Sequence, residues 1–371
     1  MVIRVLHVIP SMQHGGGMST VVMNYLRNID HDDFVFDVVC HGPYDEDYKA
    51  EIERYGGTLT GFENIGLSNV LDTMTRVRQY FDAHGRYDVV HCHMANAAFI
   101  YLKIAKQRNV PLRVLHSHQD HYADSWQHAM RNVPIVAYGK RFANCYIACS
   151  KKAGDFLFGK KPYTVLQNSI PTEVYRFNGE VRAKWRNEYG FDDDDIVFAN
   201  IGRLTLQKNQ RFLLQAFAGL HTAEPKSKLV VAGDGELRKE LQRYTRSLGI
   251  ADDVIWFGNV STIDEFYQGM DILLFPSLYE GLPMVLVEAQ AAGVTSLVSD
   301  TITREAIVTD YAKMLPIDKG VEPWIEAGLK AVSDLASSDR TLGARRVRDA
   351  GFDINDTVRD LEDIYRQSIY N

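Results

Sequence analysis

Residues 275–293, FPSLYEGLPMVLVEAQAAG, decide the fold assignment, because two carboxylates stand there among apolar side chains. The run DILLF predicts a buried strand that ends at Phe275, and GLP predicts a turn into a helix that begins near Met284. Glu280 precedes this helix and Glu288 lies about one turn inside it. An acid in apolar surroundings requires a partner. From the acids alone, a solvated or ion-paired role and a ligand-binding role are equally open.

The whole stretch resembles the Glu-(seven residues)-Glu motif of retaining glycosyltransferases with the GT-B fold, and FPS, EGLP and EAQAAG are similar to family 4 in particular. The resemblance implies that Glu280, beside Gly281 and Leu282, contacts hydroxyls of a donor sugar and that Glu288 holds the ribose of a sugar nucleotide. A carboxylate suits both roles, because it accepts two hydroxyl hydrogen bonds at once and discriminates against a ligand that lacks them.

Length and composition indicate an ordinary globular protein of two domains, with 371 residues, 46% hydrophobic and 24% charged. No run approaches the roughly 18 to 20 apolar residues of a membrane span. The start, MVIRVLHVIPSMQHGGG, predicts a first strand and loop rather than a signal peptide, so we expect a cytoplasmic location. The cysteines have no zinc or redox spacing and are expected to be reduced structural thiols; they are Cys40, Cys92, Cys145 and Cys149.

The net charge is −7, but residues 100–165 form a basic region that carries 11 Lys or Arg against 3 acids. A negatively charged partner would be met there, but no nucleic-acid-binding signature accompanies the charge, so nucleic acid is not expected. Residues 133–161 interleave apolar side chains with lysines. This pattern suits peripheral docking on the anionic cytoplasmic leaflet, to reach a lipid-linked acceptor. A solvated basic face is the alternative.

Short apolar runs alternate with amphipathic segments, which predicts βα units in two open α/β sheets. The expected strands are VIRVLHVI, FVFDVVC, DVVHCH, LRVLHS, CYIAC, YTVL, IVFANIG, KLVVAG, DVIWF, DILLF and VTSLVS. We expect an N-terminal acceptor-side domain at 1–172 and a donor-side domain at 173–352, both Rossmann-like and facing a central cleft. Residues 353–371 should form an amphipathic helix, which by resemblance crosses back to the N-terminal domain.

Ligands bind at the carboxyl ends of strands in such sheets, so the loops there are the candidates for function. The first loop carries three glycines before the helix MSTVVMNYLRNI. Backbone amides at such a helix start can approach a phosphate, although a flexible turn is an equally open explanation. The run GGMSTVVMN resembles the glycine loop of family 4, which implies that Gly16 and Gly17 meet the donor diphosphate. Many members carry an acid where this chain has Ser19.

The second loop, residues 116–121, is rich in histidine. Without a matching carboxylate set a metal site is not favoured, and a buried core histidine is one alternative. The string HSHQ resembles the histidine-bearing loop of capsular and exopolysaccharide members of family 4, in which one histidine faces the donor sugar and the acceptor. Alternation along the strand places His116 and His118 on one side, and His118, nearer the loop tip, is the favoured candidate.

The third loop contains the string GRL-x-x-QKN at 202–209. An arginine and a lysine five positions apart at a strand end can clamp a diphosphate, although two basic residues alone are usually solvated. The string resembles the second signature of family 4, which assigns Arg203 and Lys208 to the donor phosphates.

Residues 299–305, SDTITRE, form the fourth loop, in which the amides of Thr301 or Thr303 are candidates for a phosphate contact. Members often have a Gly pair here, so SDTIT resembles the capsular subgroup. The string AGDG at 232–235 also fits the family and is expected to shape a turn.

These resemblances, which cover nearly the whole chain, imply an α-retaining hexosyl- or N-acetylhexosaminyl-transferase. It would use a nucleotide sugar, most simply a UDP-sugar, and a saccharide or lipid-linked acceptor in capsule or exopolysaccharide synthesis. The residues expected to act in catalysis are His118, Glu280, Arg203 and Lys208. No cofactor is expected and no metal, because neither Asp45-Glu46-Asp47 nor the acidic run at 192–195 forms a credible DxD motif. A catalytically silent partner subunit and a disaccharide synthase or phosphorylase of the same fold are the alternatives.

Overall fold

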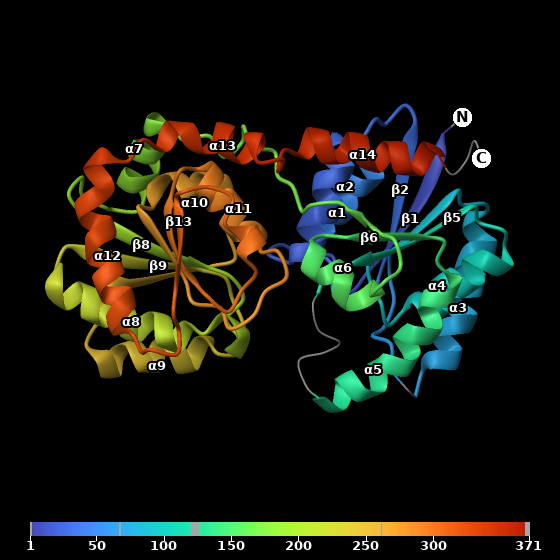
Figure 1. Cartoon of the computed structure of the whole chain (residues 1–371), viewed down its shortest axis with the longest axis horizontal. Coiled ribbons are helices and arrows are strands. Elements are labelled where there is room, and N and C mark those ends of the chain that lie inside the picture. Colours follow the sequence, from blue (N-terminus) through green and yellow to red (C-terminus); the bar gives the residue numbers. More distant parts are fainter. Residues whose placement is uncertain (1, 67, 120–125, 261, 368–371) are drawn as a thin grey trace. The chain divides into compact units, whose positions relative to one another are not determined.

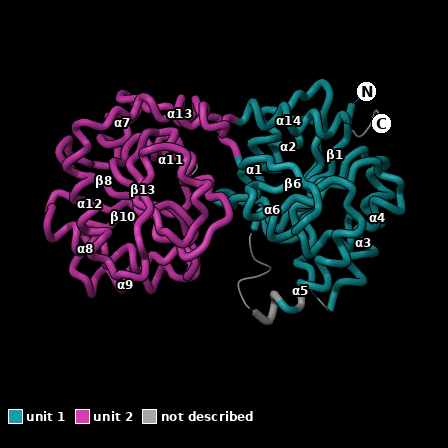
Figure 2. Tube along the Cα trace, viewed as in Figure 1, with its two compact units in different colours: residues 1–168, 354–371 teal, residues 169–353 magenta. Residues whose placement is uncertain are grey.

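The computed structural model describes residues 2–66, 68–119, 126–260 and 262–367. The chain divides into two compact units, each of which is described by itself (Figures 1 and 2). Unit 1 comprises residues 1–168 and 354–371, and unit 2 comprises residues 169–353. The boundaries expected from the sequence were 172/173 and 352/353.

Within the described part of unit 1, seven parallel strands form one sheet in the order β3-β2-β1-β4-β5-β6-β7. The strands are β1 (Ile3–Ile9), β2 (Phe34–Cys40), β3 (Leu59–Gly61), β4 (Val89–Cys92), β5 (Leu112–Ser117), β6 (Cys145–Ala148) and β7 (Thr164–Val165). The helices are α1 (Gly17–Asn28), α2 (Glu46–Arg54), α3 (Val70–His84), α4 (Ala98–Gln107), α5 (Trp126–Gly139), α6 (Lys151–Phe158) and α14 (Ile354–Gln367).

Unit 2 has a sheet of six parallel strands among its described residues, in the order β10-β9-β8-β11-β12-β13. Its strands are β8 (Ile196–Ile201), β9 (Ser227–Ala232), β10 (Val254–Gly258), β11 (Ile272–Phe275), β12 (Thr295–Ser299) and β13 (Ala312–Leu315). Its helices are α7 (Gly179–Glu188), α8 (Gln210–Ala223), α9 (Arg238–Leu248), α10 (Ile263–Gly269), α11 (Met284–Ala291), α12 (Glu322–Asp334) and α13 (Gly343–Asp349). The two sheets confirm the predicted α/β class.

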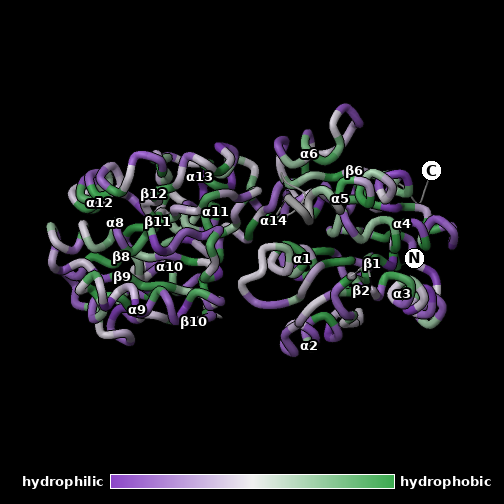
Figure 3. Tube along the Cα trace, turned by 90° about the horizontal axis from the view of Figure 1, so that it is seen from below, coloured by the Kyte–Doolittle hydropathy of each residue, from purple (hydrophilic) through white to green (hydrophobic). Residues whose placement is uncertain are grey.

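Helices cover both faces of each sheet, and this explains why the strands are apolar almost throughout. In unit 1, α1 packs against α14, while α4 packs against α3 and α5. In unit 2, α8 packs against α9 and α12, and α7 packs against α10. Hydrophobic residues follow the strands, whereas the outer helix α9 is largely hydrophilic (Figure 3).

The C-terminal helix α14 is amphipathic, as its sequence predicts. Its buried apolar side chains, Ile354, Val358, Leu361 and Tyr365, recur at helical spacing. Helix α14 therefore closes the face of the first sheet on which α1 lies.

The strand order of each sheet reverses between two central strands, β1 and β4 in unit 1 and β8 and β11 in unit 2. In open parallel sheets, ligands bind beside the carboxyl ends of the strands at such a switch point. The glycine loop follows β1, and the motifs that contain Arg203 and Glu280 follow β8 and β11. Each unit thus carries its candidate residues at its own switch point.

Candidate active site

The pair Lys208 and Glu280 is the centre of the candidate site in unit 2. Lys208 Nζ lies 2.6 Å from Glu280 Oε1, and the two side chains are only 15% and 12% exposed. The ammonium also lies 4.9 Å from the ring centroid of Phe275, a distance typical of a cation–π contact. The folding of β8 and β11 side by side thus joins residues that stand 72 positions apart.

The loops after β8 and β11 are fastened to each other by one hydrogen bond between their main chains and by two side-chain donors on the β8 loop. Gln207 Nε2 donates to the carbonyl of Tyr279 at 2.8 Å, and the Leu278 amide donates to the carbonyl of Gln207 at 2.8 Å. Asn209 adopts the left-handed conformation (φ 54°) and donates to the carbonyl of Pro276. These bonds hold the Lys208 backbone against the Glu280 loop. The backbone on both sides of the ion pair is therefore fixed, and we call these two joined loops the frame of the site.

Arg203 lies at the edge of this frame with an exposed side chain. Its carbonyl accepts a hydrogen bond from Gln210 Nε2 at 3.0 Å, which fixes the backbone. Among the described residues, no hydrogen bond or ion pair engages the guanidinium. An exposed guanidinium on a fixed backbone is suited to an incoming anion.

Gly233 and Gly235 shape the turn that presents Arg203. A Cβ on Gly233 would lie 2.1 Å from the carbonyl oxygen of Gly202, and a Cβ on Gly235 would lie 2.4 Å from that of Leu204. Only glycine therefore allows the two loops to approach so closely. This is the structural role that the sequence predicts for AGDG.

The fourth loop supports the site from β12. Thr301 Oγ1 donates to the carbonyl of Ser277 at 3.0 Å, so this side chain braces the loop that leads to Glu280. Thr303 caps a short 3₁₀ turn by accepting from the Glu305 amide, and it is 7% exposed. Gly281 is half-buried and Leu282 is buried in the turn before α11.

Glu288 is buried on α11, and its Oε2 accepts a hydrogen bond from Tyr267 at 2.8 Å. Burial raises the pKa of Glu288, while hydrogen bonds from Tyr267 and Tyr175 act in the opposite direction. The solvated alternative weighed for this acid is therefore wrong. Neither tyrosine is marked by a sequence pattern, since tertiary packing alone brings them to the carboxylate.

In unit 1, the glycine loop leads into α1 with Gly16 as its N-cap. In the part of the chain that the structure describes, no side-chain hydrogen bond caps this helix start, so the amides of its first turn are available to an anion. Ser19 is buried, donates to the carbonyl of Ser11 at 3.0 Å and accepts from the Gln13 amide at 3.2 Å. A Cβ on Gly16 would lie 2.8 Å from Ser19 Oγ, whereas Gly17 has open space. Ser19 therefore fastens the glycine loop.

Histidines surround the carboxyl ends of β4 and β5. His116 and His118 stack at 4.0 Å between ring centroids, as strand alternation predicts. His116 is completely buried, whereas His118 is partly exposed and bonds through Nε2 to His93 Nδ1 at 2.8 Å. Burial lowers the pKa of His118 to about 4, so its imidazole is neutral at pH 7. Asp120 and His121, named with this loop, lie outside the described residues.

Sequence reasoning overlooked three further histidines, His7, His91 and His93, all buried beside this pair. The string HCH at 91–93 repeats the i, i+2 spacing of HSH at 116–118, and that repetition on a neighbouring strand is the signal that could have revealed them. The four cysteines are free, as predicted.

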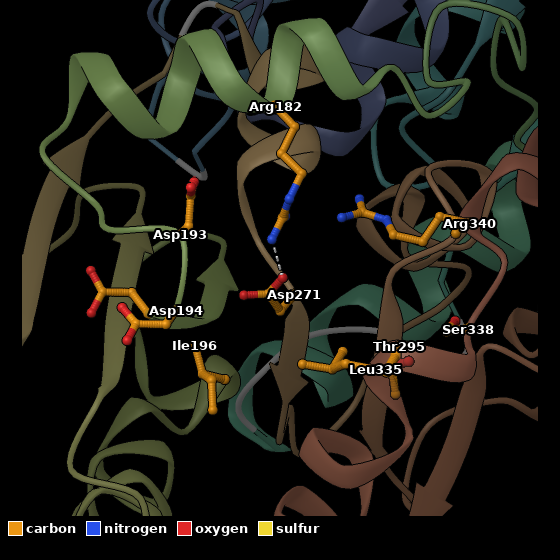
Figure 4. A pocket seen from close by; sticks show the side chains of 12 residues that line it. Arg182, Asp193, Asp194, Ile196, Asp271, Thr295, Leu335, Ser338 and Arg340 are labelled. Atoms are coloured by element: carbon orange, nitrogen blue, oxygen red, sulfur yellow. Dashed lines mark hydrogen bonds and ion pairs between the residues drawn. The ribbon is translucent and has the colours of Figure 1, made fainter.

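A cavity of about 350 Å³ in unit 2 lies apart from these motifs, where β8, β11 and β12 begin (Figure 4). Arg182 Nη2 donates to Asp271 Oδ1 at 2.6 Å, and Arg340 donates to the carbonyls of Tyr267 and Met270. Burial lowers the pKa of Arg340 to about 9. Because these donors bind Asp271 or a helix C-terminus, the cavity is explained by structural bonds.

Two family models match the chain, "Glycosyltransferase Family 4" over residues 15–174 and "Glycosyl transferases group 1" over residues 181–340. EpsF of Bacillus subtilis (strain 168) is 30% identical over 98% of this chain and 97% of its own length. The UDP-Gal:alpha-D-GlcNAc-diphosphoundecaprenol alpha-1,3-galactosyltransferase of Escherichia coli is 23% identical over 100% of this chain and 98% of its length.

Among solved structures, Anabaena Alr3699/HepE in complex with UDP-glucose matches 97% of this chain and 99% of its own, with a TM-score of 0.78 and 19% identity. The lipopolysaccharide-biosynthesis glycosyltransferase WaaG matches 97% and 99%, with a TM-score of 0.75 and 16% identity. These likenesses show that the chain, with its two α/β units, has the GT-B fold. The chain belongs to glycosyltransferase family 4, as its motifs predict.

Proposed function

We propose that this glycosyltransferase uses a UDP-sugar, transfers the sugar with retention of the α configuration, and extends a saccharide or a lipid-linked saccharide during capsule or exopolysaccharide synthesis. The observation that carries the proposal is the mostly buried ion pair between Lys208 and Glu280, together with the exposed guanidinium of Arg203 on the loop that carries Lys208. Two cations and one carboxylate at a switch point match the two parts of a sugar nucleotide, the diphosphate and the sugar hydroxyls.

The diphosphate becomes more negative as the bond to the sugar breaks, so catalysis depends on charge stabilisation at that end of the donor. Arg203 and Lys208 supply two positive charges on fixed backbones. Through the family resemblance, the amides of Gly16 and Gly17 are assigned to the same diphosphate, and the uncapped start of α1 suits an anion. These groups would stabilise the negative charge of the diphosphate without a metal ion, so we propose a metal-independent reaction.

Glu280 binds the donor sugar in this proposal, with Lys208 holding the carboxylate in a fixed orientation. Glu288 binds the ribose in this proposal through acceptor positions of its carboxylate that the hydrogen bonds from Tyr267 and Tyr175 do not use. His118, neutral and partly exposed, donates or accepts a hydrogen bond between donor sugar and acceptor. Retention follows from attack on the face that the diphosphate leaves, with a phosphate oxygen taking the acceptor proton.

The names of relatives support the donor and the acceptor. The Escherichia coli relative is named for UDP-Gal and a diphosphoundecaprenol-linked sugar, and the Anabaena structure contains UDP-glucose. The exposed apolar side chains of α5, Met130, Val133 and Tyr138, suit peripheral contact with the membrane that would carry such an acceptor. Among the described residues, no helix has the length and apolarity to cross a bilayer.

Product stereochemistry tests this proposal. The full chain is incubated with a UDP-α-sugar and a lipid-linked or free saccharide acceptor, and the new anomeric proton is followed by NMR. An α-linked product, formed equally well with and without EDTA, is expected. A β-linked product or loss of turnover in EDTA would overturn the retaining or the metal-independent part, respectively.

A further inference from the structure

Five buried or nearly buried histidines form one cluster at the switch point of unit 1, which we call the histidine array. Its members are His7 on β1, His91 and His93 at the end of β4, and His116 and His118 at the end of β5. The proposed transfer uses only His118. The array is therefore larger than the reaction requires.

His93 occupies the middle of the array, with both ring nitrogens engaged by imidazoles. Its Nδ1 lies 2.8 Å from His118 Nε2, and its Nε2 lies 3.0 Å from His7 Nδ1. The ring of His93 is thus held in one orientation from both sides.

His116 is held from one side only. Its Nδ1 lies 3.0 Å from His91 Nε2, and His91 Nδ1 lies 2.6 Å from the hydroxyl of Tyr365 on α14. The other nitrogen, His116 Nε2, is buried and has no hydrogen-bond partner among the residues that the structure describes. A buried polar atom without a partner is costly, and such atoms commonly indicate a ligand or ion that completes the site.

We propose that His93, His116 and His118 form a binding site for one transition-metal ion of the zinc type. Each contributes one ring nitrogen, and the three nitrogens lie within 4.8 Å of one another. A tetrahedral zinc ion with bonds of about 2.0 Å places its ligands roughly 3.3 Å apart, so small movements of the rings would suffice. Three imidazoles without a carboxylate select zinc, copper or nickel rather than magnesium or calcium.

The other histidines of the array act as supports for the ligands. Metal-bound histidines are usually oriented by a partner on their second nitrogen. His7 provides that partner for His93, and His91, itself held by Tyr365, provides it for His116.

The alternative set, His7, His91 and His93, meets the same distance condition but is fully buried. The proposed set includes the partly exposed His118, which gives an ion a path of entry and leaves a coordination position for water. This difference favours the set at the ends of β4 and β5.

Metal binding has a consequence that rests on the proposed function. Because the ion would occupy a nitrogen of His118, zinc should inhibit transfer, and a chelator should restore it. Inhibition by metal is compatible with a reaction that needs none.

Zinc binding to the full chain, measured by equilibrium dialysis after EDTA treatment, tests the site without any activity assay. We expect about one zinc per chain, with affinity reduced on the order of 100-fold or more in His93→Ala and in His116→Gln. His118→Ala, at the exposed edge, provides a variant least prone to misfolding, and circular dichroism checks all three. Cobalt(II) bound to the parent should show the intense visible absorption of a tetrahedral site.

His14→Ala is the matched control, because His14, Asp45 and Asp47 form a second cluster that could attract a cation. Loss of zinc in His14→Ala, with retention in folded His93→Ala and His118→Ala, would overturn the proposal. So would zinc binding by the parent no greater than that of the three array variants. Stoichiometric binding without inhibition would support the metal site and count against the proposed role of His118 in transfer.

Discussion

Lys208 Nζ and Glu280 Oε1 lie 2.6 Å apart at the carboxyl ends of β8 and β11, in side chains that are mostly buried. A buried ion pair is expensive to form, and removing one partner leaves the other charge uncompensated. The pair is therefore better explained as a preformed binding element than as a source of stability. In that account, a sugar hydroxyl and a phosphate oxygen take over part of its hydrogen bonding.

The ion pair predicts non-additive stability. Lys208→Met should lower the free energy of unfolding by about 3 kcal/mol, because it leaves the Glu280 carboxylate unpaired in a mostly buried position. The double variant Lys208→Met/Glu280→Gln should recover much of this loss, since no charge remains. Urea denaturation of the parent, both single variants and the double variant measures the coupling. Additive losses would contradict the preformed pair.

Glu288 predicts a stability that depends on pH. Burial raises its folded-state pKa above the ordinary 4.5, so the protonated form favours folding. This contribution is complete below pH 4.5 and is lost as the pH rises through the folded-state pKa. As the pH increases through this window, the melting temperature of the parent should therefore fall relative to that of Glu288→Gln.

Tyr267→Phe serves as the companion variant, because it removes a hydrogen bond that favours the carboxylate. Tyr267→Phe should raise the folded-state pKa of Glu288 further, so that the pH-dependent loss of stability occurs at higher pH than in the parent. A difference between parent and Glu288→Gln that does not vary with pH would contradict this explanation.

Ser19 predicts a link between loop anchoring and donor binding. Ser19→Ala removes two hydrogen bonds of the glycine loop and should cost about 1 kcal/mol of stability. Because the loop then loses its fixed shape, donor affinity should also fall several-fold. Thr222→Ala, which removes an exposed hydroxyl bonded within α8, is the control and should change neither quantity. Calorimetric titration with UDP distinguishes the two variants.

The turn at Gly233 predicts a steric effect on Arg203. In Gly233→Ala the new Cβ would meet the carbonyl oxygen of Gly202 at 2.1 Å, so the backbone before Arg203 must move. Donor affinity should fall at least tenfold, because a displaced guanidinium loses its phosphate contact. Gly249→Ala also falls at a positive φ, 73° against 127° at Gly233, but with open space around it, and should cost about 1 kcal/mol of stability without affecting affinity. Equal effects of Gly233→Ala and Gly249→Ala on donor affinity would refute the proposed steric effect of Gly233 on Arg203.

Much of the fold follows from local patterns. Each expected strand is present, and α11 begins at Met284, because long apolar runs and the GLP turn are strong local signals. Strands β3 and β13 were missed, because LTG and AKML are too short and too mixed to show a period. Their place is determined by pairing with β2 and β12.

The residues of the candidate site that belong to sequence motifs could be predicted. The contacts that tertiary packing creates between those residues and others could not. The resemblance identified Arg203, Lys208 and Glu280, but not that Lys208 and Glu280 bind each other. The tyrosines that bind Glu288 and the histidines that surround His118 belong to elements distant in the sequence. No sequence spacing predicts that they contact these two residues. Tertiary structure supplies these partners.

Binding of nucleotide sugars, scored by thermal shift, tests the central claim most directly. A panel of UDP-, GDP- and TDP-sugars is compared on the parent, Arg203→Ala and Glu280→Gln. Binding to the native state raises the melting temperature by mass action, with about 2.7 kcal/mol of stabilisation at a hundredfold excess over Kd. We predict that a UDP-sugar stabilises the parent and that both variants lose the effect. Stabilisation by no nucleotide sugar, or equal stabilisation of all three proteins, would contradict the account.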